Sequence, residues 1–195
     1  MGKRILLIQA HPDASQAHLC HALENAYIQG AGDAGHELWR FNIAELNFSL
    51  LKSEYEWQQN NLPPDLQEAQ TAIKWAEHIV FFFPLWLGDM PAILKGFLEQ
   101  VARPGFAFSR EAKNPLSSKL LGGRSARVVV TMGMPATVYR WYFRAHSIKS
   151  LERNILGLVG ISPVNETLIG MTGNMDAAVA EKWLGKMKQF GAQGD

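Results

Sequence analysis

Two residues with acid–base side chains, Tyr139 and His146, follow the apolar segment 126–131. A phenol can donate a proton to a developing negative charge, and an imidazole can transfer a proton near neutral pH. Ordinary packing is the alternative role for each. Arg140 and Arg144 could contact a nucleotide phosphate, although their spacing also suits the solvated face of a helix. Tyr139 and His146 are therefore the candidate catalytic pair.

A group of polar residues follows the first apolar segment, residues 4–10. Ser15, Gln16 and His18 offer side-chain donors to a phosphate, and the N–H groups at the start of a helix attract anions. The alternative is that Ser15 only caps the helix. Because the loop would lie beside the switch point of a doubly wound sheet, we expect it to bind phosphate.

The apolar run 79–83 ends at Pro84, and Pro91 suits the first turn of a following helix. The run is short and rich in aromatic and β-branched residues, which indicates a central strand covered on both faces. The loop between the two prolines begins with Pro84, Leu85, Trp86 and Leu87. It lies at the carboxyl end of a strand, where open α/β sheets bind ligands.

A third loop, residues 132–138, follows the strand predicted at 126–131. The hydroxyl of Thr131 and the N–H groups of Met132 and Gly133 should reach the same edge of the sheet as Pro84. We therefore expect the loops to form one site.

A metal site is not expected. Residues 10–13 look like the opening of zinc-dependent deacetylases, but Ala14 and Ser15 stand where that site needs further carboxylates. Without the second carboxylate there is no base to activate a zinc-bound water. His18 and His21, with Cys20 between them, could be imagined as ligands, but histidines on a helix surface are usually solvated.

The glycine pattern Gly30-x-Gly32-x-x-Gly35 matches a dinucleotide fingerprint, but it follows a helix and precedes a strand. The binding mechanism needs the strand first and the helix second. We interpret these glycines as the end of the first helix and the turn after it.

Strands alternate with helices along the chain, which predicts one α/β domain spanning residues 1–195, with a five-stranded, doubly wound parallel sheet and helices on both faces. The expected strands are 4–10, 37–43, 79–83, 126–131 and 164–169, and the expected helices are about 17–28, 66–77, 92–102, 139–158 and 176–190. Residues 44–64 are expected to be irregular. The polar segment 103–123 is long for a connection, which is typical of a functional loop.

The chain has 195 residues and a net charge of +1, so charge gives no case for a nucleic-acid or anionic-membrane partner. A single cysteine, Cys20, excludes an internal disulfide and suits a reducing compartment. The N-terminal apolar run is too short for a signal-peptide core, and the run 79–87 is too short to span a membrane. We expect a cytoplasmic protein with no membrane insertion.

Three motifs resemble those of the NAD(P)H:quinone reductase family of flavodoxin-like flavoproteins, over nearly the whole chain. They are His11-Pro12 after the first strand, the segment 83–96 (Phe-Pro-Leu-Trp, then Pro-Ala-Ile-Leu-Lys-Gly), and Thr131-x-Gly133 with Tyr139 beyond. The resemblance implies a flavodoxin-like fold. It also implies that the His11 loop binds the flavin phosphate, that the backbone after Pro84 contacts the flavin ring, and that the Thr131 loop completes the ring pocket.

The chain departs from the family pattern at four positions. Relatives usually have Trp at Leu87, a second Gly at Met134, and often tyrosines at Phe108 and Arg110. The resemblance therefore supports flavin binding better than it supports a particular substrate or proton relay. Arg110 and Met134 suggest an acceptor pocket of a different shape. Tyr139 matches the family's tyrosine, whereas His146 is displaced by one residue from the histidine that assists it.

The resemblance implies a flavin enzyme that moves two electrons from NAD(P)H to a quinone-like small acceptor. FMN is slightly favoured over FAD because no adenosine-binding motif is recognisable. A homodimer is expected, with residues 103–123 close to the interface. The alternative is a regulatory flavoprotein subunit that docks on a glutathione-gated potassium efflux transporter.

Overall fold

Five parallel strands form the sheet of the computed structural model, which describes residues 2–59, 61–111 and 119–195. The strands are β1 (Arg4–Gln9), β2 (Glu37–Asn42), β3 (His78–Pro84), β4 (Ser125–Thr131) and β5 (Val164–Ile169). Their order across the sheet is β2-β1-β3-β4-β5, and every neighbouring pair is parallel. The predicted flavodoxin-like α/β architecture is confirmed.

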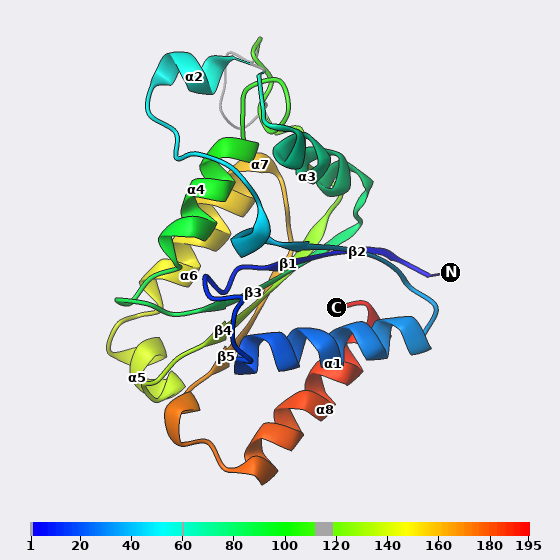
Figure 1. The fold of residues 1–195 in the computed structure, drawn as a ribbon, viewed down its shortest axis with the longest axis vertical. Coiled ribbons are helices and arrows are strands. Elements are labelled where there is room, and N and C mark those ends of the chain that lie inside the picture. Colours follow the sequence, from blue (N-terminus) through cyan, green and yellow to red (C-terminus); the bar gives the residue numbers. More distant parts are fainter. Residues whose placement is uncertain (1, 60, 112–118) are drawn as a thin grey trace.

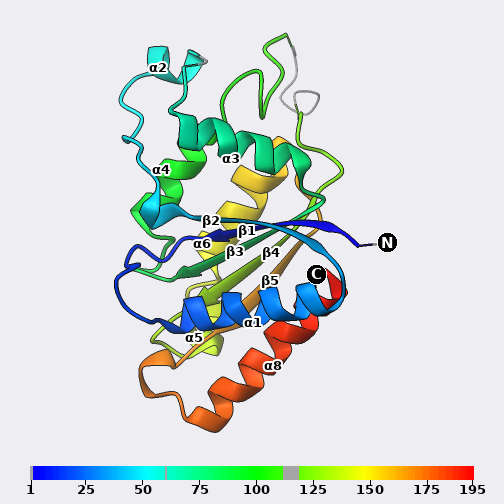
Figure 2. The same cartoon turned by 45° about the vertical axis from the view of Figure 1, so that its right-hand side comes forward.

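Helices cover both faces of this sheet (Figures 1 and 2). On one face lie α1 (Leu19–Asp33) and α8 (Ala177–Gln193). The opposite face carries α3 (Pro64–Trp75), α4 (Ala92–Val101), α6 (His146–Ser150), a π-helical turn (Leu151–Leu156) and α7 (Gly157–Val159). Every residue of β3 is buried, as its uninterrupted run of apolar residues predicts for a central strand.

The strand register aligns the carboxyl ends at one edge of the sheet. Gln9 pairs with Phe82 across β1 and β3, while Thr131 pairs with both Pro84 and Ile169. The chain passes from β1 to β2 on one side and then returns to place β3, β4 and β5 on the other side of β1. The direction of winding therefore reverses between β1 and β3. The loops that leave β1, β3 and β4 therefore meet at the switch point of the fold.

The predicted helix 139–158 is wrong as a single element. A short helix, α5 (Ala136–Trp141), is separated from α6 by residues in the left-handed backbone region, with φ of 55° at Arg144 and 49° at Ala145. The Ala145 N–H donates to the Tyr139 carbonyl at 3.1 Å, which closes this bend. Tertiary contacts here override a locally helical pattern.

Several smaller expectations are also wrong. The helical spacing of Ile148, Leu151, Ile155 and Leu158 predicts that all four face inward, but Leu158 is exposed. Helix α1 starts later than residue 17 and continues through Gly30 and Gly32, so only Gly35, with φ of 77°, makes the turn. The segment 44–64 contains a short helix, α2 (Glu54–Gln58), after a 3-10 turn at Ile43–Glu45.

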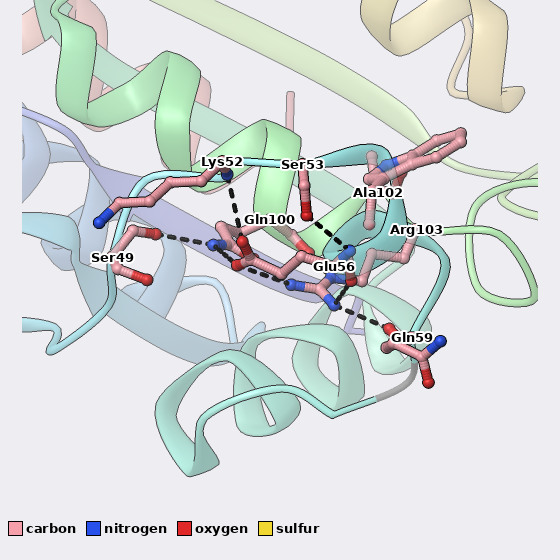
Figure 3. A network of polar contacts seen from close by, with 9 residues as sticks. Ser49, Lys52, Ser53, Glu56, Gln59, Gln100, Ala102 and Arg103 are labelled. Carbon is pink, nitrogen blue, oxygen red and sulfur yellow. Dashed lines mark hydrogen bonds and ion pairs between the residues drawn. The ribbon is translucent and has the colours of Figure 1, made fainter.

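A buried polar network holds α2 against the end of α4 (Figure 3). The Arg103 side chain is 1% exposed and donates to the carbonyls of Glu56 and Gln59 at 2.7 Å each, and to that of Gln100 at 3.0 Å. The Gln100 amide donates to the Ser49 carbonyl at 2.7 Å. The guanidinium group thus satisfies backbone oxygens of a segment that has little secondary structure.

Within the described part of the chain, no helix is both long enough and apolar enough to cross a membrane.

Of the polar segment 103–123, residues 112–118 lie outside the described residues. In the rest of that segment, isolated β-bridges pair Pro104 with Phe108 and Phe108 with Lys119.

Candidate functional site

A cavity of about 560 Å³ opens at the carboxyl edge of the sheet. Four loops supply its walls, those after β1, β3, β4 and β5, together with the first turn of α1. The lining residues are His11, Asp13, Ala17, His18, Leu19, Cys20, Pro84, Leu85, Trp86, Thr131, Met132, Gly133, Thr172 and Gly173. The three loops expected to meet from the sequence are therefore brought together.

The loop after β1 is organised around His11, which is 6% exposed. Its N–H donates to the Gln9 side-chain oxygen at 3.1 Å, and its Nδ1 accepts the Asp13 N–H at 3.1 Å. Asp13 Oδ2 lies 3.0 Å from His18 Nε2. Hydrogen bonds from Ser15 and His18 hold the pKa of the Asp13 carboxyl well below its usual range.

His18, and not Ser15, is the N-cap residue of α1. The exposed Ser15 turns back to Asp13, with its hydroxyl 2.6 Å and its N–H 2.8 Å from Asp13 Oδ1. Gln16 is also exposed, and neither Ser15 nor Gln16 lines the cavity. Their contact with a phosphate stays a prediction, whereas His11 and His18 are in the cavity wall.

The loop after β3 begins with backbone hydrogen bonds. The Leu85 N–H donates to the Thr131 carbonyl at 2.8 Å, which ties this loop to the end of β4. Trp86 and Asp89 then exchange two backbone hydrogen bonds, of 2.9 and 3.0 Å, around a tight turn. Its central residues, Leu87 and Gly88, have φ of 50° and 82°. Two consecutive positive φ angles are typical of a type I′ turn, which glycine and asparagine favour and leucine does not.

This turn separates the predicted residues of the loop. Pro84, Leu85 and Trp86 line the cavity, whereas the Leu87 side chain is fully exposed and does not. The contribution of Leu87 to cofactor binding therefore stays a prediction.

The loop after β4 places Thr131, Met132 and Gly133 in the opposite wall. Met132 is buried and its N–H donates to the Ile169 carbonyl at 2.8 Å. Thr131 Oγ1 lies 3.0 Å from Cys20 Sγ, across the cavity floor from α1. Burial raises the pKa of the Cys20 thiol to about 12, so this side chain is a neutral wall group.

Thr172 and Gly173, in the loop after β5, were not expected from the sequence. The Thr172 N–H donates to the Met132 carbonyl at 3.2 Å, which fixes this loop against the previous one. Their position after the fifth predicted strand could have revealed them, because the carboxyl ends of parallel strands meet at one edge of a sheet. No motif marks this loop, so the sequence analysis did not include it in the site.

Tyr139 and His146 do not line the cavity. Tyr139 is buried in the hydrophobic core, and its hydroxyl has no hydrogen-bond partner of good geometry among the described residues. Burial raises the pKa of the Tyr139 phenol. His146 is exposed at the start of α6, next to Ser147, whose hydroxyl bonds to the Asp89 carboxylate. The catalytic role of both residues stays a prediction.

The cavity suits a phosphorylated flavin in two respects. Its volume lies in the range of small-molecule and cofactor sites, roughly 300–1,000 Å³. His11 Nε2 has no hydrogen-bond partner in the described part of the chain, and when Nδ1 accepts the Asp13 N–H, Nε2 carries the proton and can donate to an anion. The His11 ring is stacked on that of His18, the N-cap residue of α1, so such an anion would also lie near the start of this helix. Among the described residues, no group of three or more His, Cys, Asp or Glu side chains is arranged to hold a metal ion.

Comparison with known proteins gives a consistent picture. A family model described as "Flavodoxin-like fold" matches residues 3–190. An uncharacterized NAD(P)H oxidoreductase of Haemophilus influenzae is 30% identical over 169 residues, which cover 85% of this chain and 82% of that protein. The human ribosyldihydronicotinamide dehydrogenase [quinone] is 28% identical over 157 residues, covering 71% of this chain and 67% of that protein.

Among solved structures, an FMN-dependent NADH-azoreductase from Bacillus anthracis, in complex with FMN, superposes with a TM-score of 0.75. The identity is 19%, and the alignment covers 99% of each chain. That likeness concerns the fold. The match over residues 3–190 and the similarity to the Haemophilus protein show that the chain belongs to the NAD(P)H:quinone reductase family of flavodoxin-like proteins.

Proposed function

We propose that this chain is a flavin-dependent NAD(P)H oxidoreductase that transfers two electrons to a quinone or a similar small acceptor. The observation that carries the proposal is the cavity where the loops after β1, β3, β4 and β5 converge. Open α/β sheets bind nucleotide cofactors at this position. The names of the Haemophilus and human relatives, an NAD(P)H oxidoreductase and a quinone dehydrogenase, support the same reaction class.

Residues of this chain would hold the cofactor at two ends of the cavity. His11, His18 and the N–H groups of the first turn of α1 would bind the phosphate. The backbone of residues 84–86 and 131–133 would flank the ring, because both segments line the cavity and are joined by the Leu85–Thr131 hydrogen bond. A bound flavin would supply the hydride and electron chemistry, which amino-acid side chains do not provide.

The buried ends of β3 and β4 fix the positions of the two loops that would flank the flavin ring. Both loops leave strands whose last residues are buried and paired in register, Pro84 with Thr131. The packing of these strands in the core therefore fixes the two cavity walls that their loops form. Trp86 is half-exposed at the mouth, where it can cover one edge of the bound ring and limit its contact with water. Tyr139 and His146 are proposed to hold and donate the proton that balances charge on the reduced cofactor.

FMN is the proposed cofactor, with NADH or NADPH as the donor. The Bacillus anthracis azoreductase, which shares the fold, is FMN-dependent and was solved in complex with FMN, and this supports the choice. Cytoplasmic location is likewise a proposal, supported by the single reduced and buried cysteine.

A homodimer is proposed from a second, apolar cavity of about 500 Å³. Apolar side chains from α2, α4, the segment after α4, the π-helical turn and α7 line it, among them Trp57, Leu98, Phe108, Ile155 and Leu158. Leu158 is exposed there although its sequence pattern predicts burial. Phe108 belongs to the segment 103–123, which the family resemblance places near the subunit interface. Light scattering coupled to size-exclusion chromatography should give about twice 21.7 kDa, and Leu158→Glu should lower it.

The names of the Haemophilus and human relatives, an oxidoreductase and a dehydrogenase, do not favour the alternative of a transporter subunit.

Flavin titration of a cavity-blocking variant tests the proposed site. A Cβ added at Gly133, in the cavity wall, meets no other atom within 4 Å, and the same holds for Gly122, which does not line the cavity. Gly133→Trp should weaken FMN binding by more than about tenfold, a loss of about 1.4 kcal/mol. Gly122→Trp should bind FMN like the wild type. Equal FMN affinity for the two variants would place the flavin elsewhere.

A further inference from the structure

A third cavity, of about 300 Å³, lies along β5, the strand at one edge of the sheet. Residues of β4, β5, α5 and α8 form its walls. Among the described residues, none that lines this cavity also lines the candidate flavin cavity. A ligand held here would therefore occupy a site of its own.

Positively charged side chains predominate in the walls of this cavity. Arg127, Arg140 and Lys186 line it, and Glu166 is the one carboxylate among the described lining residues. Arg140 pairs with Glu166 at 2.6 Å, and Arg127 pairs at 2.7 Å with Asp195, which does not line the cavity. Lys186 forms no ion pair within the described part of the chain. One positive charge is therefore left over after both carboxylates are counted.

Arg127 is the most buried of the three cations, at 5% exposed. Its Nη1 donates to Thr167 Oγ1 at 2.8 Å, and its Nη2 donates to the Asp195 carboxylate. The Nε atom is buried and has no hydrogen-bond partner among the described residues. Because a buried N–H of a charged group is costly to leave without an acceptor, this donor on a cavity wall indicates that an acceptor atom completes the site.

Aromatic rings lie beside two of these cations. The Phe190 ring centroid is 3.7 Å from Arg127 Cζ and 5.5 Å from Lys186 Nζ, and the Trp183 ring centroid is 5.1 Å from Lys186 Nζ. Attraction between the cations and the rings holds these side chains in place. Trp183, Phe190 and Leu168 also line the cavity, so its walls offer apolar surface next to the positive charge.

We propose that this cavity binds a small organic anion. Its carboxylate or phosphate group would lie at Arg127, Arg140 and Lys186, and its apolar body would pack against Trp183 and Leu168. Guanidinium groups bind both kinds of oxyanion through paired N–H donors, and a lysine adds a compact point charge. A volume at the lower end of the range for small-molecule sites, roughly 300–1,000 Å³, suits a single ring with one acidic group. The inference does not depend on the proposed flavin function.

Calorimetric titration of the full chain at constant ionic strength tests the site. Benzoate and phenyl phosphate are the two anionic probes, benzamide is the neutral probe of similar shape, and inorganic phosphate is the anion without an apolar body. We expect saturable binding of at least one aromatic anion, and its identity distinguishes a carboxylate from a phosphate ligand. Benzamide and inorganic phosphate should each bind at least about tenfold more weakly, because each lacks one of the two kinds of contact.

Two substitutions test whether the probe binds in this cavity. Arg140→Gln and Lys186→Gln should each weaken binding of the preferred anion at least about tenfold, and the first also leaves Glu166 without its partner. Both side chains are exposed, so the variants should fold. Lys182→Gln is the matched control, because Lys182 is an exposed lysine on α8, four residues before Lys186, that does not line the cavity. It should bind the anion like the wild type.

NMR of the tryptophan indole N–H groups provides a readout at the site itself. The Trp183 signal, assigned by its loss in Trp183→Phe, should shift with the same midpoint as the calorimetric titration. A shift of the Trp86 signal without one of Trp183 would place the probe in the flavin cavity and overturn the proposal. Failure of both aromatic anions to bind, benzamide binding as tight as theirs, or equal affinities in Lys186→Gln and Lys182→Gln would overturn it as well.

Discussion

Cys20 Sγ lies 3.0 Å from Thr131 Oγ1, a contact that joins the first turn of α1 to the end of β4 under the candidate flavin site. Both residues are buried and both line the cavity. The pair connects elements 111 residues apart in sequence, so the cavity floor forms only when the sheet and α1 are packed.

Native Cys20 should react slowly with thiol reagents. Burial raises the pKa of its thiol from 9.0 to about 12, and the thiolate is the reactive form. Ellman's reagent at neutral pH should therefore modify the native thiol at least about a hundredfold more slowly than the urea-unfolded thiol. FMN should slow the native reaction further. Equal rates in native and unfolded protein would contradict the buried hydrogen-bonded thiol.

Tyr139→Phe and His146→Ala should slow turnover while leaving flavin bound. General acid–base groups contribute roughly 10²–10⁴-fold to rate, so each variant should lose at least about tenfold in kcat. Because burial raises the pKa of Tyr139, its phenol would act as a proton donor at neutral pH. Stopped-flow reduction and reoxidation would separate the steps, with His36→Ala as the control for His146→Ala. Wild-type rates in both variants would remove these residues from the mechanism.

Arg103→Met should destabilise the protein by about 2–4 kcal/mol, because three carbonyls lose a buried charged donor. Arg103→Lys should recover only part of this loss, since an ammonium group cannot reproduce the planar fork. The exposed Arg110 also donates to two carbonyls, those of Pro104 and Gln58, and Arg110→Met should cost less than about 1 kcal/mol. Urea unfolding measures all three. Similar losses at positions 103 and 110 would contradict the buried network.

Acid should destabilise the fold through His78. Burial lowers the pKa of His78 from 6.5 to about 4, and its Nε2 has no partner among the described atoms. The unfolded chain then binds the proton more readily, so stability is full above about pH 6.5 and falls as the pH drops toward 4. Between about pH 7.5 and pH 5 the loss should be roughly 2 kcal/mol. His78→Gln should lose about 2 kcal/mol less over this interval, and an unchanged slope would contradict this assignment.

All five strands were predictable to within one residue at either end. In β1, β3 and β4 the signal is an apolar run, which burial on both faces of the sheet imposes. The break at Arg144 and Ala145 was not predictable. Residues 139–158 have a locally helical pattern, and the bend is set by the Ala145–Tyr139 backbone bond and by the contact of Ser147 with Asp89. The contact between Ser147 and Asp89 joins residues 58 positions apart in sequence, so a local pattern does not show it.

The site was predictable in part for the same reason. His11, Pro84 and Thr131 follow recognisable strands, so topology alone brings them together. Thr172 and Gly173 were missed because the loop after the fifth strand carries no motif like the three that mark the other loops. The I′ turn that exposes Leu87 was missed because leucine is a poor indicator of two positive φ angles.

An absorption spectrum recorded through one redox cycle shows whether this chain binds a flavin and passes electrons through it. Purified protein reconstituted with FMN should show the oxidised-flavin bands, which NADH or NADPH should bleach without oxygen and a soluble quinone should restore. Gly133→Trp, handled identically, should retain little flavin after desalting, and Gly122→Trp should behave like the wild type. A protein that retains neither FMN nor FAD, or whose bound flavin is not reduced by either nicotinamide, would contradict the account.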